Sequence, residues 1–302
     1  MAAFLMTCVC ITKFNYLLPK DAGRDFAHDG KLSAGKPRGA GIIFILVFAA
    51  AALLFSELSV EIVIYIVLVI AEMLTGYLDD ASEKPWNEYK KGLLDLLVAV
   101  VLSLTFMHYN SSTIEFAIPG ISVTIPPVVF CLLSIVLIWV SINVTNCSDG
   151  VDGLSATLTI ITLITLYIVK GIERDNRQLL LFDLAVCNLF AWVFVVQCCS
   201  EPSDDGGCRI PSDGNFIAIA ALKTESPFLY IFAAFVLIAD GGIGIVKVAL
   251  LRFLKIKILT NVRTPLHDHV RKVWDWSNTQ TVFRFGIIQI VISVATIYML
   301  ML

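Results

Sequence analysis

Long apolar runs alternate with short polar segments along the whole chain, and they predict ten helices that each cross a membrane. The runs cover roughly residues 1–18, 41–56, 60–78, 93–108, 123–142, 154–169, 179–196, 215–226, 228–251 and 282–302. Several are shorter than the ~20 residues that a perpendicular span needs, so these boundaries are approximate. The expected fold is therefore an all-α polytopic integral membrane protein, with residues 1–302 forming one transmembrane domain.

The composition agrees with this pattern. Charged residues make up 16% of the chain, hydrophobic residues make up 58%, and the mean hydropathy is +0.83. A globular chain carries about 25% charged residues, so a soluble domain of this length would need more polar surface than the sequence supplies. The first apolar run is expected to be a retained span, because no cleavage site follows it.

Alternating spans divide the loops into two sets, and the basic residues fall mainly in one of them. The loops at 19–40, 79–92, 143–153, 197–214 and 252–281 hold 15 Lys and Arg residues, and the other loops hold 4. Because cytoplasmic loops of membrane proteins carry the excess of positive charge, the first set is predicted to be cytoplasmic and both termini to face outward.

The segment GYLDD at 76–80 places Asp79 and Asp80 at the cytoplasmic end of a predicted span. Adjacent carboxylates repel each other, so both remain ionised more easily with a cation nearby. Oxygen ligands at a rim open to water suit Mg²⁺, which proteins hold with one or two carboxylates and the phosphates of a substrate. Solvated charges at the end of a helix are the alternative.

The segment NVTNCSDGVDGLS at 143–155 carries Asn146, Asp149 and Asp152 at a spacing of three residues. If the segment opens the next helix, these side chains lie on one side of its first turns. Gly150 permits close approach of a ligand. A cluster of helix caps is the alternative, but the density of Asn, Asp and Gly favours a polar ligand site.

The segment RTPLHDH at 263–269 brings Arg263, His267 and His269 onto the same predicted face. Arginine meets phosphate oxygens with two parallel hydrogen bonds, so this segment suits a diphosphate. The preceding amphipathic stretch LLRFLKIKIL, at 250–259, suits the headgroup region, where an anionic lipid arrives. Together the three segments predict phosphoryl transfer between a soluble nucleotide-linked donor and a lipid phosphate.

With these segments, and with GKPRGAG at 35–41 and WSNTQTVFRF at 276–285, the chain resembles the polyprenyl-phosphate N-acetylhexosamine-1-phosphate transferase family. The resemblance is closest to its cell-wall branch, the phospho-N-acetylmuramoyl-pentapeptide transferases, and covers nearly the whole chain. It implies transfer of phospho-MurNAc-pentapeptide from UDP-MurNAc-pentapeptide to undecaprenyl phosphate, which gives lipid I and UMP and needs Mg²⁺. It also implies ten helices, a homodimer and a multi-pass protein of the bacterial plasma membrane with a cytoplasmic active site.

The resemblance also assigns roles to individual residues. Catalytic roles are expected for Asp79, Asp80 and His267, and substrate binding for Asn146, Asp149, Asp152, Lys90, Lys36, Arg263 and His269. Asp79, Asp80 and Asp152 are the expected metal ligands. Asp268 stands where the family has the central His of three, so no role of that His carries over. One-step attack by the lipid phosphate and a covalent Asp intermediate both remain open.

One family motif, of the form N..PS..MMGDAGSR.MG, is absent between the seventh and eighth predicted spans. The chain has QCCSEPSDDGGCRIPSDG at 197–214, of equal length and with three of the eight cysteines. These lack the spacing and the partners of a zinc site. Codons permitted for Asp204–Asp213 encode MMGDAGSRPM when read one nucleotide later, so we interpret the stretch as frame-shifted. The motif's metal-binding Asp then belongs at Gly207, and Asp205 is the nearest replacement.

Two other functions remain open. One keeps the chemistry but uses UDP-GlcNAc as the donor. The other is a secondary transporter, because Asp240 and Lys247 lie within a predicted span, where ionisable residues are functional candidates. They are two helical turns apart on one face, so a mutual ion pair is the alternative. Transporter sites lie at the membrane midplane, whereas the charged segments here lie at one face. No nucleic-acid partner is expected.

Overall fold

The computed structural model describes residues 41–55, 58–82, 86–115, 122–151, 153–172, 212–224 and 226–301, with four isolated residues before them. The predicted span at 179–196 lies outside the described residues, as does nearly all of that at 1–18. The ten-helix count therefore stays a prediction.

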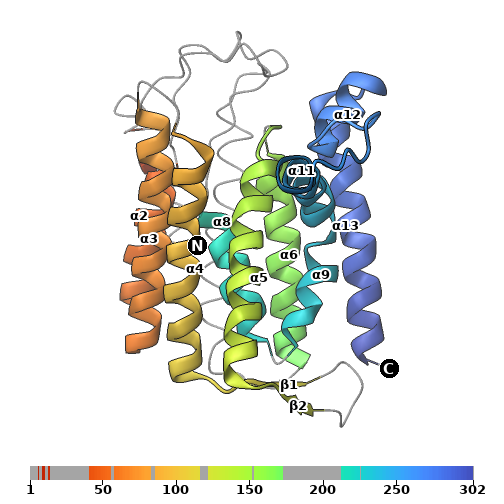
Figure 1. Cartoon of the computed structure of the whole chain (residues 1–302). Coiled ribbons are helices and arrows are strands. Elements are labelled where there is room, and N and C mark those ends of the chain that lie inside the picture. The colour runs from red at the N-terminus through yellow and green to blue at the C-terminus, as the bar shows by residue number, and fades with distance from the viewer. Residues whose placement is uncertain are drawn as a thin grey trace.

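The described helices confirm the mainly helical, membrane-spanning class (Figure 1). They are α2 (Gly41–Phe55), α3 (Val60–Ala81), α4 (Glu88–Tyr109), α5 (Pro127–Ser148), α6 (Leu154–Ile172), α8 (Ser212–Lys223), α12 (Leu266–Val273) and α13 (Asn278–Met301), with shorter helical pieces at 227–254. Within the described part, five helices are long and apolar enough to cross a membrane, or six if one bent pair counts as a span.

Local sequence signals explain where several of these helices begin. The Ser59 hydroxyl accepts a hydrogen bond from the Ile62 N–H at 3.2 Å, and Asn87 caps α4 through the Tyr89 N–H at 3.2 Å. Ser and Asn favour this position because their side chains satisfy amide groups that the first helical turn leaves without a partner. Pro127, at the first position of α5, has no N–H to satisfy.

Two short strands interrupt the otherwise helical pattern, which the sequence did not predict. β1 (Thr113–Glu115) and β2 (Ser122–Thr124) pair antiparallel, with Ile114 opposite Val123. Residues 123–124, expected at the start of a membrane span, therefore belong to this hairpin. α5 begins later, at Pro127, and continues to Ser148, six residues beyond the predicted end. The hairpin lies at one end of the bundle and α12 at the other (Figure 1), and these are called the hairpin end and the α12 end.

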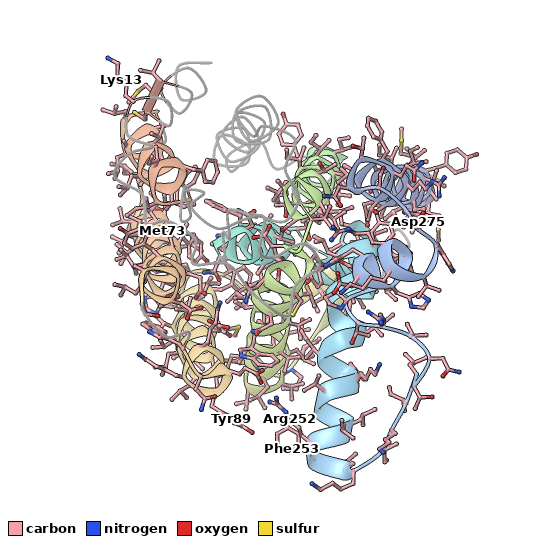
Figure 2. The ribbon with its side chains drawn as sticks, turned by 90° about the horizontal axis from the view of Figure 1, so that it is seen from above. Lys13, Met73, Tyr89, Arg252, Phe253 and Asp275 are labelled. Atoms are coloured by element: carbon pink, nitrogen blue, oxygen red, sulfur yellow. The ribbon has the colours of Figure 1, made fainter. Side chains whose placement is uncertain are left out.

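The apolar run at 228–251, expected to be one straight span, is bent. The pieces Pro227–Ala233 and Phe235–Leu254 meet at 70°. The second piece has wider π turns at Ile238–Gly242 and Leu250–Leu254. It projects sideways from the bundle, with Arg252 and Phe253 near its far end (Figure 2). Apolar content alone does not determine such a bend, because the two pieces together are long and apolar enough to pass as one span.

Close backbone approaches hold the centre of the bundle around α5. A Cβ atom at Gly214 of α8 would overlap the Ile142 backbone, and one at Gly241 would overlap the Val144 carbonyl oxygen. Leu154, Leu158, Leu163 and Leu166 of α6 are fully buried beside them. Small residues permit this approach, which fixes the end of α5 relative to the π turn that contains Asp240.

Candidate active site

Three of the polar segments selected from the sequence lie at the α12 end. α3 and α5 both end there, α12 lies there, and α4, α6 and α13 begin there (Figure 1). GYLDD closes α3, the 143–155 segment joins α5 to α6, and RTPLHDH leads into α12. The expected gathering of carboxylates and histidines at one end of the bundle is confirmed for these segments.

Asp79 lies in the last turn of α3 and contacts the start of α4. Its Oδ1 accepts a hydrogen bond from the Trp86 N–H at 2.8 Å, and its Oδ2 lies 3.4 Å from the Lys91 Nζ. Lys90, the lysine expected to bind substrate, is exposed and places its Nζ 3.4 Å from the centre of the Trp86 ring. The cation at Asp79 is thus Lys91, which the sequence argument did not select.

The Asn146–Asp152 region differs from its expected geometry. Asn146 lies in the last turn of α5 and Asp149 follows that helix as its C-terminal cap, whereas α6 begins only at Leu154. The segment therefore closes one helix and does not open the next. Polar side chains of α5 extend the helix beyond its apolar run, because Asn143, Thr145 and Ser148 hydrogen-bond carbonyls of α5 or of the neighbouring bent segment.

His267 is the most closely held of the predicted site residues. Its imidazole Nδ1 lies 2.8 Å from Asp240 Oδ2, and its backbone N–H donates to Asp240 Oδ1 at 2.7 Å. Both side chains are buried, with 3% and 1% of their surfaces exposed. The other ring nitrogen, Nε2, is the atom closest to where a Cβ of Gly150 would stand, and it would overlap that atom. His267 of α12 therefore faces the Asp149–Gly150 segment at the end of α5.

The surroundings of His267 favour its protonated form. Burial opposes the charge, but the Asp240 carboxylate, through its charge and its hydrogen bond, outweighs burial and raises the pKa of His267 above its ordinary value of 6.5. Asp268 acts in the same direction and Arg271 opposes it. An imidazolium at this position presents an Nε2–H donor to an anionic ligand.

The Asp240–His267 pair contradicts the alternative that Asp240 pairs with Lys247. Lys247 donates a hydrogen bond to the Val262 carbonyl at 2.6 Å. In a regular α-helix, Asp240 and Lys247 would share one face. The π turn at Ile238–Gly242 changes their spacing and directs Asp240 toward α12. A mutual ion pair of Asp240 and Lys247, the structural alternative to a transporter site, is thus absent among the described residues.

Arg263 and His269 lie beside this pair in the RTPLHDH segment. The Arg263 backbone N–H donates to His269 Nδ1 at 3.3 Å, and the Arg263 side chain is exposed. The His269 ring packs on Trp274 with 5.8 Å between ring centres, and Trp274 packs on Trp276. Arg284 lies over the Trp276 ring at 4.2 Å. These contacts order a cationic and aromatic surface that is continuous with α12.

Acidic residues that the sequence argument did not select are buried nearby. Asp213, at the start of α8, is 2% exposed, and its carboxyl group is close enough to Asp149 for their charges to repel. Glu72 and Asp95, from α3 and α4, are 0% and 1% exposed, and their carboxyl oxygens have no hydrogen-bond partner among the described residues. Their positions within apolar runs could have identified them, since a buried carboxyl group needs a partner.

The described residues do not test the Mg²⁺ expectation. The described side chains include no group of three His, Cys, Asp or Glu residues placed to hold a metal ion. Of the expected ligands, Asp79 alone is described, and its contacts with Lys91 and Trp86 suit an ionised carboxylate. The Asp80 side chain, Asp152, Asp205 and position 207 lie outside the described residues, as does Lys36. The metal site and the frame-shift interpretation stay predictions.

Comparison with known proteins shows which family the chain resembles. A family model described as Glycosyl transferase family 4 matches residues 62–196. A phospho-N-acetylmuramoyl-pentapeptide-transferase of Treponema pallidum subsp. pallidum is 37% identical over 95% of this chain and 84% of its own length. Proteins with the same name from Wolbachia pipientis and Streptococcus agalactiae are each 24% identical, over 88% and 98% of this chain and 84% and 97% of their own lengths.

The fold and the site define a polytopic membrane protein with acidic and basic groups gathered at one end of a helix bundle. Within that class, the chain belongs to the phospho-N-acetylmuramoyl-pentapeptide-transferase family, as the identity and coverage of the Treponema relative show. The match to Glycosyl transferase family 4 spans α3 to α6, which include Asp79, Asn146 and Asp149.

Proposed function

We propose that this chain transfers phospho-MurNAc-pentapeptide from UDP-MurNAc-pentapeptide to undecaprenyl phosphate, giving lipid I and UMP, at the cytoplasmic face of a bacterial plasma membrane. The observation that carries the proposal is the 37% identity, over 95% of the chain, to a relative named for this transfer. The site supports it, because a carboxylate with a lysine partner and a buried histidine–aspartate pair lie at one end of the same bundle.

In the proposed reaction, an oxygen of the lipid phosphate forms a bond to the β-phosphorus of the nucleotide donor. The bond from that phosphorus to the bridging oxygen breaks, and UMP leaves with this oxygen. Phosphoryl transfer depends mainly on positioning and on stabilisation of negative charge. The protein groups suited to these tasks are His267, Arg263 and Lys91, which bring positive charge to the α12 end, where His267 offers a donor near Gly150.

Mg²⁺ would supply neutralisation of the diphosphate charge, and Asp79, with Asp80 and Asp152, would hold it. Asp79 keeps one oxygen oriented by the Trp86 N–H, which fixes the carboxylate whether or not Lys91 is displaced. Lys91 would then partner Asp79 while no metal is bound. A homodimer remains part of the proposal through the family resemblance.

The amphipathic segment at 250–259 supports a lipid acceptor. Phe253 and Leu254 are 78% and 61% exposed, and Arg252 forms an ion pair with Glu88 at 2.6 Å. Figure 2 shows this segment projecting beside Tyr89, at the start of α4. Exposed apolar side chains next to basic ones suit the boundary between acyl chains and headgroups, where an anionic lipid approaches.

The proposal is tested with the purified full-length chain in lipid nanodiscs, undecaprenyl phosphate and radiolabelled donors. We expect lipid-extractable label and UMP from UDP-MurNAc-pentapeptide, loss of both on chelation of Mg²⁺, and recovery on its return. Asp79→Asn should lower the rate by about 1,000-fold, since it removes a charge that holds the metal. The matched control Asp275→Asn, an exposed carboxylate on the same end, should stay within about twofold.

The same assay separates the alternatives. Transfer from UDP-GlcNAc in place of the muramoyl donor would assign the chain to the other sugar. Saturable solute flux without transfer of label would overturn the enzymatic function and support a transporter.

A further inference from the structure

Asp240 holds His267 in a way that a simple helix cap does not require. One carboxylate oxygen accepts the backbone N–H of His267 at 2.7 Å, which caps α12, and the other lies 2.8 Å from the ring nitrogen Nδ1. A cap needs only the first of these contacts. The second fixes the rotation of the imidazole ring and determines which nitrogen carries a proton, because an ionised carboxylate can only accept.

The position of Asp240 is itself fixed by the fold. It lies in the π turn Ile238–Gly242, and it is 0% exposed. The next residue, Gly241, packs directly on the Val144 carbonyl of α5, and Ser148 of the same helix donates to the Leu237 carbonyl at 3.5 Å. The π turn is therefore fixed to α5, the helix that ends at the Asp149–Gly150 segment.

These contacts link the two parts of the site through one side chain. α5 carries the Asp149–Gly150 segment, the π turn on α5 carries Asp240, and Asp240 orients His267 so that Nε2 faces Gly150. We infer that Asp240 is a positioning residue, which keeps Nδ1 of His267 protonated and holds the Nε2 edge of the ring against Gly150, so that Nε2 can donate, beside this glycine, to a phosphate oxygen of a nucleoside diphosphate. The inference deepens the proposed function and rests on it.

Charged groups around His267 agree with an anionic ligand. Asp240 and Asp268 favour the imidazolium, and Arg271 opposes it, so the pKa of His267 is raised on balance. Arg271 lies 4.0 Å and Lys272 3.8 Å from Asp268, which limits the influence of that carboxylate. Asp240 is thus the one side chain of residues 227–273 that both contacts the His267 ring and compensates its charge.

The test uses nitrogen NMR of the full-length chain labelled with ¹⁵N-histidine in nanodiscs. The chain has four histidines, His28, His108, His267 and His269, so three single substitutions assign the spectrum. In the wild type, we expect Nδ1 of His267 to carry a proton, and added UDP to shift the Nε2 signal of His267 and not that of His108. In Asp240→Asn, the amide can still accept the backbone N–H but donates to Nδ1, so Nδ1 should lose its proton.

Kinetics provide a second readout. Asp240→Asn should lower kcat/KM for the nucleotide donor by about 100-fold, mainly in kcat, which is the cost of misplacing a reacting group by about 1 Å. Asp240→Glu, which keeps the carboxylate, should restore the Nδ1 proton and part of the rate. The matched control Asp268→Asn removes a carboxylate on α12 that does not touch the ring, and it should change neither the Nδ1 signal nor kcat/KM beyond about twofold.

Three results would overturn the inference: an Nδ1 of His267 without a proton in the wild type, an Nε2 signal that ignores UDP, or an unchanged Nδ1 signal in Asp240→Asn. If Asp240→Asn does not fold, the Nδ1 signals of His267 in the wild type and in Asp240→Glu still test the inference. A wild type that transfers no sugar phosphate would refute the proposed function. The Nδ1 and Nε2 signals of His267 would still test whether Asp240 orients the ring.

Discussion

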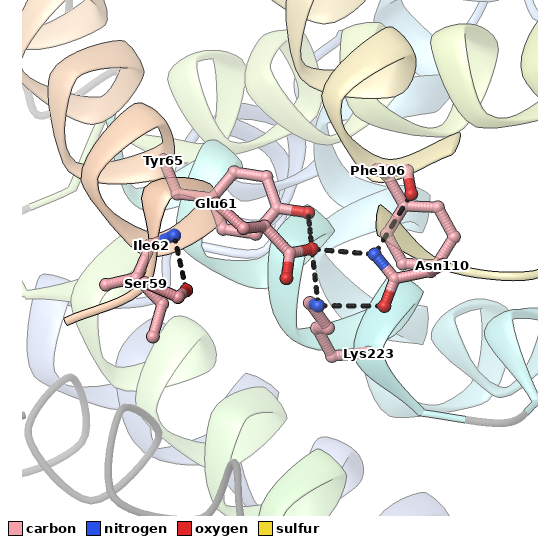
Figure 3. A network of polar contacts seen from close by, with 7 residues as sticks. All are labelled: Ser59, Glu61, Ile62, Tyr65, Phe106, Asn110 and Lys223. Carbon is pink, nitrogen blue, oxygen red and sulfur yellow. Dashed lines mark hydrogen bonds and ion pairs between the residues drawn. The ribbon is translucent and has the colours of Figure 1, made fainter. Parts of the chain in front are cut away.

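Two clusters of charged side chains lie at opposite ends of the bundle, and they use their hydrogen-bonding atoms differently. At the hairpin end, Glu61, Tyr65, Asn110 and Lys223 form a closed network, called here the hairpin-end network (Figure 3). Glu61 Oε1 accepts from Tyr65 at 2.7 Å, from Asn110 at 2.6 Å and from Lys223 at 2.6 Å, and Lys223 also donates to Asn110 Oδ1 at 3.0 Å.

At the α12 end, Asp240 holds His267 with both of its oxygens, but the network does not close. The ring nitrogen Nε2 faces Gly150, and within the described residues it makes no hydrogen bond of its own. The hairpin-end network joins α3, α4 and α8 and directs its polar atoms at one another. A network that satisfies its own donors stabilises the fold, whereas the Asp240–His267 pair places its remaining ring nitrogen against the Asp149–Gly150 segment.

A large effect on activity, second to that of Asp79→Asn, is expected from Gly150→Ala. The added methyl group would overlap Nε2 of His267 and displace the ring, so kcat/KM should fall by about 100-fold. The midpoint of thermal unfolding should fall only by what the disturbed Asp240–His267 contact contributes, because Gly150 itself is exposed. Assays of transfer and thermal scans of the same preparation measure both.

Gly242→Ala is the matched control for that change. Its methyl group would stand 3.5 Å from Val144 Cγ1, which is ordinary contact, so both activity and unfolding temperature should stay near those of the wild type. Equal losses in the two variants would show that the α12 end responds to any added methyl group and not to the position of His267.

At the hairpin end, a substitution is expected to lower stability and to leave activity nearly unchanged. Lys223→Met leaves the Glu61 carboxylate without its cation in a site where the two side chains are 12% and 9% exposed, so stability should fall by about 3 kcal/mol. Thermal unfolding in detergent measures the loss, and the kcat of the folded fraction should stay within about twofold of the wild type. A large loss of kcat without a loss of stability would contradict the structural role.

The double variant Glu61→Gln with Lys223→Met sharpens this result. It removes both charges, so it should recover part of the stability that Lys223→Met alone loses. If the losses of unfolding free energy in Glu61→Gln and in Lys223→Met add up to the loss in the double variant, Glu61 and Lys223 do not interact in the folded protein.

The smallest expected effect concerns pH. The folded-state pKa of His267 is raised above 6.5 by Asp240, so the pair stabilises the fold fully at pH values below 6.5. This contribution is lost as the pH rises through the raised pKa. Thermal scans should therefore show the wild type losing about 2 °C more than His267→Gln as the buffer changes from acidic to alkaline. Parallel curves for the two proteins would contradict the direction of the shift.

Several features of the fold could be predicted from the sequence because they depend on local properties. The apolar runs at 41–56, 60–78 and 154–169 lie within a few residues of α2, α3 and α6. The helices begin and end near capping residues such as Ser59 and Asn87, which act within a single turn. The gathering of GYLDD, the 143–155 segment and RTPLHDH at one end also followed from the alternation of spans.

Features that depend on contacts between distant segments were predicted wrongly or missed. The contact of Asp79 with Lys91 was missed, because it depends on how α4, which begins at Glu88, packs on α3. Lys223 and Glu61 are 162 residues apart, and no local pattern links them. The small hairpin at 113–124 pairs two segments that contain few apolar residues for a periodicity to reveal.

The sequence by itself determined the membrane-spanning class, the ends of most helices and the motifs that relate the chain to its family, because hydrophobicity, caps and motifs are properties of short segments. Only the tertiary structure decided that Asp240 pairs with His267 and not with Lys247. That choice depends on a bend of 70°, on a π turn and on the close packing of Gly241 against α5, and each of these is set by neighbouring helices.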